Sequence, residues 1–303
     1  MQHDIDHIYP SFFVLGAQKC GTSTIHNWLA QNPNLCLPEQ KESHYFSNEL
    51  NYKKGLKWYD GWFKGESNKI RVEVDPSYLF IKETASRMRE TINSNIAFII
   101  IIRDPILRAY SHYRMSVQRG LESLNFIDAI TREKNRLEVD YDNISLLNHS
   151  YITRGKYNEQ IKHYRTIFPD SKILFLKFND LFTSKSRLIM YRNICHFISI
   201  HPEIKKINLD IQSRPASKSR FIWLSKLIHK NSWLKKNAQK AISSDMYRGR
   251  IVSFIDEANK MPDRAYVSFD KSILPDNILE WANKEIVQTS ELTNLDLNEW
   301  LNN

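Results

Sequence analysis

The sequence predicts a three-layer α/β protein, in which a central parallel sheet lies between two layers of helices. Short apolar segments alternate along the chain with longer amphipathic ones. Such alternation is typical of a parallel sheet that is covered on both faces. The run Ala-Phe-Ile-Ile-Ile-Ile at 97–102 is apolar and mostly β-branched, as expected of a central strand. The predicted strands are 12–15, 70–74, 97–102 and 172–177, and the predicted helices are 22–30, 82–91, 105–119, 126–136, 156–167 and 187–199.

The size and composition of the chain favour one large domain over residues 1–303. A chain of 303 residues with 42% hydrophobic residues can bury a full core. Each candidate ligand motif occurs once, which argues for one sheet. The segment 138–148 is polar and aromatic and is predicted to be a loop or lid, and 278–300 is predicted to be a closing amphipathic helix.

The first strand leads into a glycine-bounded loop and a helix. The loop runs from Gly16 to Gly21, and Thr22, Ser23 and Thr24 open the helix. A helix start carries unpaired N–H groups and partial positive charge, so it readily binds a phosphate or sulfate group. Lys19 adds a mobile positive charge within the loop. The segment is therefore P-loop-like and predicts an anion site.

The loop departs from the Walker A pattern of nucleoside triphosphatases. The two glycines keep the Walker A spacing, but Thr22 stands where that pattern has a lysine, and Lys19 lies earlier. A P-loop kinase or triphosphatase remains an alternative, with Asp104 holding magnesium, although Arg103 places positive charge beside such a site. An ordinary strand-turn-helix, or a binding module with a degenerate loop, also remains open.

The strand at 97–102 ends in Arg103-Asp104-Pro105, and the following helix carries Ser111 in its second turn. Ligands of open α/β sheets gather beyond the carboxyl ends of the strands. Arg103 lies at such an end, as does the loop that holds Lys19. Because arginine is always charged and binds phosphate in a bidentate manner, Arg103 is a second candidate phosphate ligand.

The Gly-x-x-Lys-x-Gly-Thr-[ST] loop, followed by Arg103-Asp104-Pro105 and Ser111, resembles the sulfotransferases. These enzymes use 3′-phosphoadenosine 5′-phosphosulfate (PAPS) and release 3′,5′-adenosine bisphosphate. The resemblance implies that Arg103 and Ser111 hold the 3′-phosphate of the donor. It also implies a binding loop for the 5′-phosphosulfate made of Gln18, Lys19, Cys20, Gly21, Thr22, Ser23 and Thr24.

Three further segments resemble the heparan-sulfate-type N- and 3-O-sulfotransferases. Lys41-Glu-Ser-His-Tyr-Phe46 resembles their Lys-Glu-x-His-Phe-Phe signature, and Gly55-Leu-Lys-Trp-Tyr59 their Gly-x-x-Trp-Tyr element. Glu73-Val-Asp-Pro-Ser-Tyr78 resembles their Glu-x-x-Pro-x-Tyr element. Val74 stands where some 3-O-type members have a lysine that contacts the acceptor. We therefore expect a carbohydrate acceptor without assigning a heparan-type one, and a small lipid or metabolite remains an alternative.

The catalytic residues expected from this resemblance are Glu42 and Lys19. Glu42 is the candidate general base that takes the proton of the acceptor, and Lys19 is expected to stabilise the departing phosphate. His44 is a second candidate base or an orienting group, because its ordinary pKa lies near neutral pH. Lys41, His44 and Tyr78 are candidate acceptor-binding residues. The alternative interpretation of this segment is a solvated, charged loop.

Basic residues gather late in the chain, whose formal net charge is +9. Sulfotransferases commonly cover the 3′-phosphate with a late basic loop, and Arg214, Lys218 and Arg220 are candidates for that role. Residues 213–220 are predicted to be a loop, and the distal half of the segment 218–240 is predicted to be an amphipathic helix with a solvated basic face. Binding to a membrane surface or a nucleic acid is the alternative for it, but no recognised nucleic-acid module accompanies it, and we expect no nucleic-acid partner.

No metal is expected, because the three cysteines lack Cys-x-x-Cys spacing and the histidines are scattered. The N-terminal residues show neither a basic start nor an apolar run, so we expect no signal peptide. The apolar run 97–102 is far too short to span a membrane, so we expect no transmembrane segment. A small, odd number of cysteines fits a reducing compartment, and the expected location is the cytoplasm.

Overall fold

A computed structural model describes residues 9–64, 68–92, 96–139, 144–211, 217–229, 245–262 and 269–301. The contacts within it divide the chain into two compact units. The first takes in the residues up to Asp104, Lys156–Ser213 and Asn283–Leu301, and the second takes in Pro105–Gly155 and Arg214–Ala282. The single domain expected over 1–303 stays a prediction.

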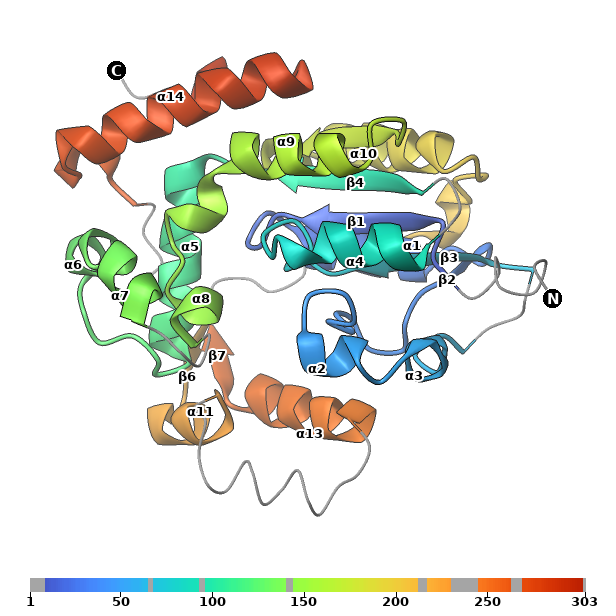
Figure 1. Ribbon diagram of the computed structural model, residues 1–303, viewed down its shortest axis with the longest axis horizontal. Coiled ribbons are helices and arrows are strands. Elements are labelled where there is room, and N and C mark those ends of the chain that lie inside the picture. The colour runs from blue at the N-terminus through green and yellow to red at the C-terminus, as the bar shows by residue number, and fades with distance from the viewer. Residues whose placement is uncertain are drawn as a thin grey trace. The chain divides into compact units, whose positions relative to one another are not determined.

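The first unit is built on a five-stranded parallel sheet with the order β2-β3-β1-β4-β5 (Figure 1). All four predicted strands are present within one residue of their expected ends. The sequence did not indicate the additional edge strand, β2, which is only two residues long and has no periodicity to detect. The strands are β1 (Phe12–Gly16), β2 (Leu35–Cys36), β3 (Ile70–Val74), β4 (Ala97–Ile102) and β5 (Ile173–Lys177).

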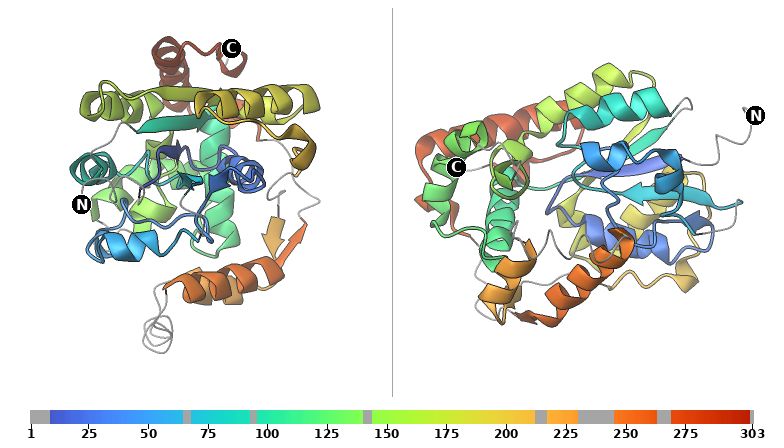
Figure 2. Two further views of the ribbon diagram at one scale, coloured as in Figure 1. Left: turned by 90° about the vertical axis from the view of Figure 1, so that its right-hand side faces the viewer. Right: turned by 60° about the horizontal axis from the view of Figure 1, so that its bottom comes forward.

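Helices cover both faces of this sheet, which confirms the predicted α/β fold with a central parallel sheet. One face carries α4 (Glu83–Thr91) and α9 (Tyr157–Ile167), and the other carries α1 (Thr22–Ala30) and α10 (Ser184–Phe197) (Figure 2, left). On the second face the rings of Trp28 and Tyr191 meet edge to face at 6.3 Å. Residues 98–102 of β4 are fully buried, as their apolar sequence requires.

The carboxyl ends of the five strands lie along one edge of the sheet, because all the strands are parallel. The segments that leave this edge carry most of the candidate site residues of this unit. Two short helices, α2 (Glu49–Tyr52) and α3 (Leu56–Asp60), follow the loop after β2. Three 3₁₀ turns also belong to this unit: η2 (Phe178–Leu181), η3 (Ile204–Lys206) and η5 (Asn298–Trp300).

The second unit is mainly helical and has its own core. That core is formed by Ile106, Ala109, Phe126, Ala129, Ile130, Tyr151, Leu274 and Ala282. A two-stranded antiparallel pair, β6 with β7, also belongs to this unit. Its elements are α5 (Pro105–Gln118), α6 (Phe126–Thr131), α7 (Glu133–Val139), α8 (Ile144–Asn148), η1 (Thr153–Gly155), β6 (Ser217–Ser219), α11 (Ile222–His229), α13 (Asp245–Ala258), β7 (Lys260–Pro262) and η4 (Lys271–Ile273).

Two predictions for the second unit are wrong in part. The single helix expected over 126–136 is two helices, separated at Arg132. Just before that break, the Thr131 hydroxyl donates to the Ile127 carbonyl at 2.8 Å, a bond that competes with regular helix geometry. The loop expected over 138–148 instead contains the end of α7 and the whole of α8.

Helix boundaries elsewhere follow local capping. The helix predicted at 187–199 begins at Ser184, because the Thr183 side chain accepts from the backbone N–H of Ser186 at 3.1 Å. The closing helix predicted over 278–300 is α14 (Asp276–Thr293), which ends where Asn294 turns left-handed, at φ 56°. The basic helix predicted for the distal half of 218–240 falls almost wholly on residues 230–244, which lie outside the described residues.

None of the helices in the described residues is long and apolar enough to cross a membrane.

Candidate active site

The loop after β1 presents the N-terminus of α1. Gly21 is the N-cap residue of this helix, with φ 88°, and no side chain of the described residues caps it. Gly21 has no side chain that could cap the first N–H groups of the helix, and a helix start of this kind suits a phosphate-type group. Lys19 adopts a left-handed φ of 71° inside the loop and is half-buried.

Glycine is required at position 21 for two reasons. Its φ lies in the left-handed region, and a Cβ there would collide with the side chain of Leu181. The loop thus packs directly on η2 at the end of β5. Of the three hydroxyl residues that follow, Thr22 and Thr24 are buried and Ser23 is half-buried.

Arg103 lies against the same loop. Its guanidinium donates to the backbone carbonyl of Lys19 at 3.4 Å and stacks 4.4 Å from the centre of the Phe178 ring. Its own carbonyl accepts from the hydroxyl of Tyr157 at 2.9 Å, and that hydroxyl lies 3.7 Å from the sulfur of Cys20. The structure therefore brings together the first loop and the arginine at the end of β4.

The other predicted donor contacts belong to the second unit or lie outside the described residues. Ser111 is half-buried in α5 of the second unit, so its joint role with Arg103 stays a prediction. Arg214 lies outside the described residues, and Lys218 belongs to β6. Arg220 is exposed, and its backbone N–H donates to the carbonyl of Asn259 at 2.7 Å.

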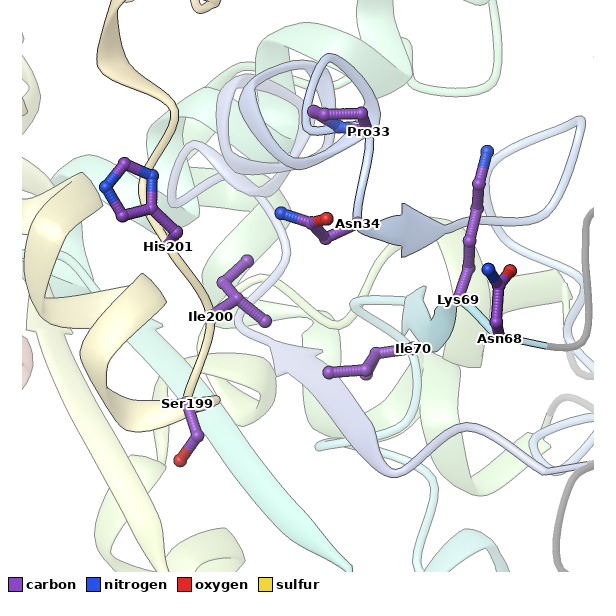
Figure 3. Close-up of a pocket in the computed structure, with 8 residues that line it drawn as sticks. All are labelled: Pro33, Asn34, Asn68, Lys69, Ile70, Ser199, Ile200 and His201. Carbon is purple, nitrogen blue, oxygen red and sulfur yellow. The ribbon is translucent and has the colours of Figure 1, made fainter.

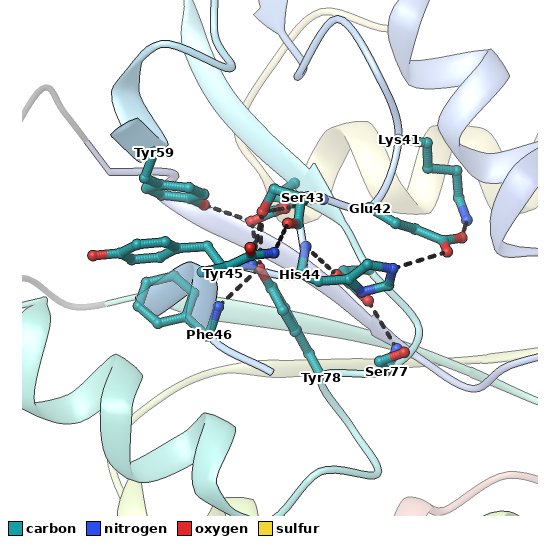
Figure 4. A network of polar contacts seen from close by, with 12 residues as sticks. Lys41, Glu42, Ser43, His44, Tyr45, Phe46, Tyr59, Ser77 and Tyr78 are labelled. Carbon is teal, nitrogen blue, oxygen red and sulfur yellow. Dashed lines mark hydrogen bonds and ion pairs between the residues drawn. The ribbon is translucent and has the colours of Figure 1, made fainter. Parts of the chain in front are cut away.

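The loop after β2 carries the candidate base. Glu42 and His44 both have left-handed backbones, with φ 69° and 52°. The ammonium of Lys41 contacts the Glu42 carboxylate, and the other Glu42 oxygen lies 3.9 Å from Nε2 of His44 (Figure 4). Glu42 thus lies between two side chains that can carry positive charge.

Two buried carboxylates, one from β3 and one from the residue after it, hold this loop in place. Asp75 accepts from the backbone N–H of His44 at 3.0 Å and faces Nδ1 of its ring at 2.9 Å. Glu73 accepts from the backbone N–H of Ser43 at 3.2 Å and from its hydroxyl at 2.5 Å. Both carboxylates are fully buried, so protein groups have to replace the water that each would otherwise bind.

Electrostatics separates the roles of the two candidate bases. Loss of hydration lowers the pKa of His44, but the adjacent Asp75, with Glu42 and Glu73, outweighs this and raises it to about 9. His44 is therefore protonated at neutral pH and holds no lone pair for an acceptor proton. His26 on α1 shows the opposite shift, because burial and the nearby Lys41 lower its pKa to about 4.

Tyr78, which was predicted to bind the acceptor, is fully buried behind the loop. Its hydroxyl donates to Glu73 at 3.0 Å and accepts from the backbone N–H of Phe46 at 3.4 Å. The hydroxyl of Tyr59 donates to the same Glu73 oxygen at 2.5 Å. In this position Tyr78 supports the loop and does not face solvent. The Glu-x-x-Pro-x-Tyr element carried no signal of this role, because the role depends on a loop some thirty residues earlier in the chain.

A separate cavity of about 400 Å³ opens near the starts of β2 and β3, away from their carboxyl ends (Figure 3). None of the predicted site residues lines it. Its lining residues are Pro33, Asn34, Asn68, Lys69, Ile70, Ser199, Ile200 and His201. Within the described ranges, no group of three or more His, Cys, Asp or Glu side chains is arranged to hold a metal ion.

Comparison with known proteins identifies the family. The family model described as a sulfotransferase domain matches residues 9–274. The mouse heparan sulfate glucosamine 3-O-sulfotransferase 5 is 27% identical over 68% of this chain and 58% of its own length. The mouse bifunctional heparan sulfate N-deacetylase/N-sulfotransferase 4 is 30% identical over 56% of this chain and 20% of its own. The chain thus spans little more than half the length of the first of these relatives.

Among solved structures, a sulfotransferase from Alicyclobacillus acidocaldarius superposes with a TM-score of 0.64, at 20% identity over 96% of this chain and 98% of that one. At this identity the likeness shows the shared fold. The family match establishes that the chain belongs to the sulfotransferase domain family, whose members are PAPS-dependent enzymes.

The unfolding free energy should depend on pH through Glu73. Burial, with the neighbouring Asp75, raises its pKa from 4.5 to about 7 in the folded protein. The folded state therefore holds a proton that the unfolded chain releases. This carboxyl stabilises the fold fully below about pH 4.5, and the contribution is lost as the pH rises through about 7. We expect Glu73→Gln to flatten the decline in stability between about pH 5 and about pH 8.

Urea unfolding across this pH range measures the effect. Glu39→Gln is the matched control, because Glu39 pairs with Lys64 on the exposed part of the neighbouring loop and should keep the wild-type pH dependence. An unchanged slope in Glu73→Gln would show that Glu73 does not bind the proton.

Proposed function

We propose that this chain transfers a sulfuryl group from PAPS to a hydroxyl or amine of an acceptor, and that the acceptor is a carbohydrate. The observation that carries the proposal is the arrangement of three groups along one edge of the sheet. The loop with Lys19 follows β1 and leads into the start of α1. Arg103, the residue after β4, contacts that loop, and Glu42 lies in the loop after β2. These are the groups that anion binding and proton removal require.

The donor is held by the chain's own anion-binding groups. The N–H groups at the start of α1, with the hydroxyls of Thr22, Ser23 and Thr24, receive the 5′-phosphosulfate. Arg103 receives the 3′-phosphate with the help of Ser111, as the family motif implies. The late basic residues are further candidates for covering that phosphate, namely Arg214, Lys218 and Arg220.

The transfer step needs one base and one group that stabilises the leaving phosphate. Glu42 removes the proton from the acceptor hydroxyl or amine as that atom forms its bond to sulfur. The bond between sulfur and the bridging oxygen breaks in line, and Lys19 stabilises the negative charge that develops on the departing phosphate. The products are the sulfated acceptor, 3′,5′-adenosine bisphosphate and a proton on Glu42. Because His44 is protonated at neutral pH, it is the weaker candidate for the base.

The acceptor class is supported by the family resemblance and by charge. The two relatives named above are described as acting on heparan sulfate, a carbohydrate. Lys41 contacts Glu42 beside the reaction centre and is suited to an acceptor that already carries negative charge. A small lipid or metabolite acceptor would use the same donor site and the same base.

Ligand-dependent thermal stability tests the donor site directly. A ligand that binds only the folded state raises the melting temperature, and it does so more strongly the tighter it binds. We expect 3′,5′-adenosine bisphosphate to raise it clearly, and ATP with magnesium to raise it little. The reverse order would contradict the sulfotransferase proposal and favour the P-loop kinase alternative.

Replacing the base should separate chemistry from binding. We expect Glu42→Gln to lower the turnover rate by about a hundredfold to ten-thousandfold, the usual contribution of a general base. Binding of 3′,5′-adenosine bisphosphate should stay within about twofold of wild type, because the glutamine keeps the size of the side chain. Turnover with a panel of carbohydrate acceptors and calorimetric binding measure the two quantities. Glu39→Gln is the control, and a wild-type rate in Glu42→Gln would exclude Glu42 as the base.

Replacing the arginine at the end of β4 should alter the recognition of one phosphate. We expect Arg103→Ala to weaken binding of 3′,5′-adenosine bisphosphate about tenfold to a hundredfold, since a charge-assisted hydrogen bond is lost. Binding of adenosine 5′-phosphate, which lacks the 3′-phosphate, should change much less. Arg165→Ala is the control, because Arg165 is exposed on α9 and donates to the carbonyl of Leu292. Equal losses for both nucleotides would remove the 3′-phosphate role.

A further inference from the structure

Asp75 is bound on both of its carboxylate oxygens. One oxygen, Oδ2, accepts from the backbone N–H of His44 at 3.0 Å and lies 2.9 Å from Nδ1 of the same residue. The other, Oδ1, accepts from the backbone N–H of Ser77 at 2.9 Å. Because Asp75 is fully buried, these contacts fix its orientation and, through it, both the backbone and the ring of His44.

We propose that Asp75 is a positioning residue for the transfer reaction, which holds His44 so that its Nε2–H faces the Glu42 carboxylate. The inference rests on the proposed role of Glu42 as the base. The 3.9 Å separation between Nε2 of His44 and the Glu42 oxygen places a positive charge beside the base without sharing its proton. The charge favours the ionised form of Glu42, which is the form that can accept the proton of the acceptor.

The loop needs this support because its backbone is strained. Left-handed φ values at Glu42 and His44 are unfavourable for residues other than glycine, and they persist only where surrounding contacts determine them. Asp75 and Glu73 supply those contacts at His44 and Ser43, respectively. The dashed contacts around His44 and Ser43 show how the two residues are held (Figure 4).

Several other charged or titratable groups surround His44 and Glu42. Lys41 contacts Glu42 from the same loop, and Glu73 acts on His44 from β3. His26 acts on this group from α1, but its lowered pKa leaves it neutral above about pH 4. The buried hydroxyls of Tyr59 and Tyr78 donate to Glu73. Both remain protonated, because burial raises the pKa of each well above 10. Of the two carboxylates that contact the His44 ring, Asp75 is the nearer, at 2.9 Å from Nδ1, whereas Glu42 lies 3.9 Å from Nε2.

The test combines Asp75→Asn with a titration of the His44 ring by NMR, assigned with His44→Gln. In wild type we expect His44 to titrate near its raised pKa of about 9, and in Asp75→Asn to titrate nearer the ordinary value of 6.5. The alkaline limb of the pH–rate profile should move down with it by at least about one pH unit. The turnover rate at about pH 8 should fall by about a hundredfold, as expected for a misplaced catalytic group.

Ser43→Ala is the matched control. It removes the hydroxyl bond to Glu73 and leaves both Asp75 contacts to His44 in place, so it can lower the rate without moving the alkaline limb. His44→Gln tests whether the charge on His44 gives the alkaline limb. Because the His44 side chain is 42% exposed, this variant is less disruptive to folding than Asp75→Asn. It should remove the alkaline limb. Thermal unfolding checks that each variant is folded.

Three results would overturn the inference. The first is an unchanged His44 titration in Asp75→Asn, and the second is a shifted titration in that variant with an unmoved pH–rate profile. The third is a wild-type alkaline limb in His44→Gln. None of these results bears on the proposed donor site, because nucleotide binding tests that site separately. A wild-type rate in Glu42→Gln would instead remove the proposed base, while the His44 titration would still measure the Asp75 contact.

Discussion

The parallel arrangement of the five strands is the constraint on which the site depends. Since every strand ends at the same edge, the order β2-β3-β1-β4-β5 fixes the order of the segments that follow them. Glu42 therefore follows the edge strand, Asp75 lies next to it, the loop of Lys19 is central, and Arg103 lies on its far side. The proposed base and the proposed anion site follow different strands, so the sheet sets their separation.

Precision at this edge has an energetic cost. Lys19, Glu42 and His44 hold left-handed backbones that cost on the order of 1–3 kcal/mol each. Two carboxylates are also fully buried close together in the chain, at positions 73 and 75. The backbone and ring of His44 compensate the second of them. Hydroxyl donors compensate the first, from Ser43, Tyr59 and Tyr78. The remaining cost of the strained backbone and the buried carboxylates is offset by burial of the large apolar core of the first unit.

The sequence predicts what is local and misses what depends on tertiary packing. The strand at 97–102 and the loop around Lys19 were recognisable because a continuous apolar run and a glycine spacing are properties of neighbouring residues. The two-residue strand β2 has no such pattern. Asp75 was present in a recognised motif, yet its partner His44 lies 31 residues earlier. The pairing of β2 with β3 is what brings those two residues together.

In the proposed reaction, the contact between Asp75 and His44 matters most once Glu42 has taken up a proton. Before transfer, Glu42 lies between Lys41 and His44, and Asp75 lies against the other ring nitrogen of His44. If Glu42 is the base, as proposed, its negative charge is lost when it accepts the acceptor proton, and Lys41 and His44 each lose that contact as an ion pair. His44 remains paired with the buried Asp75, and Lys41 is left to face the anionic products. A carboxylate behind the histidine therefore prevents the proton on Glu42 from leaving an uncompensated imidazolium in the site.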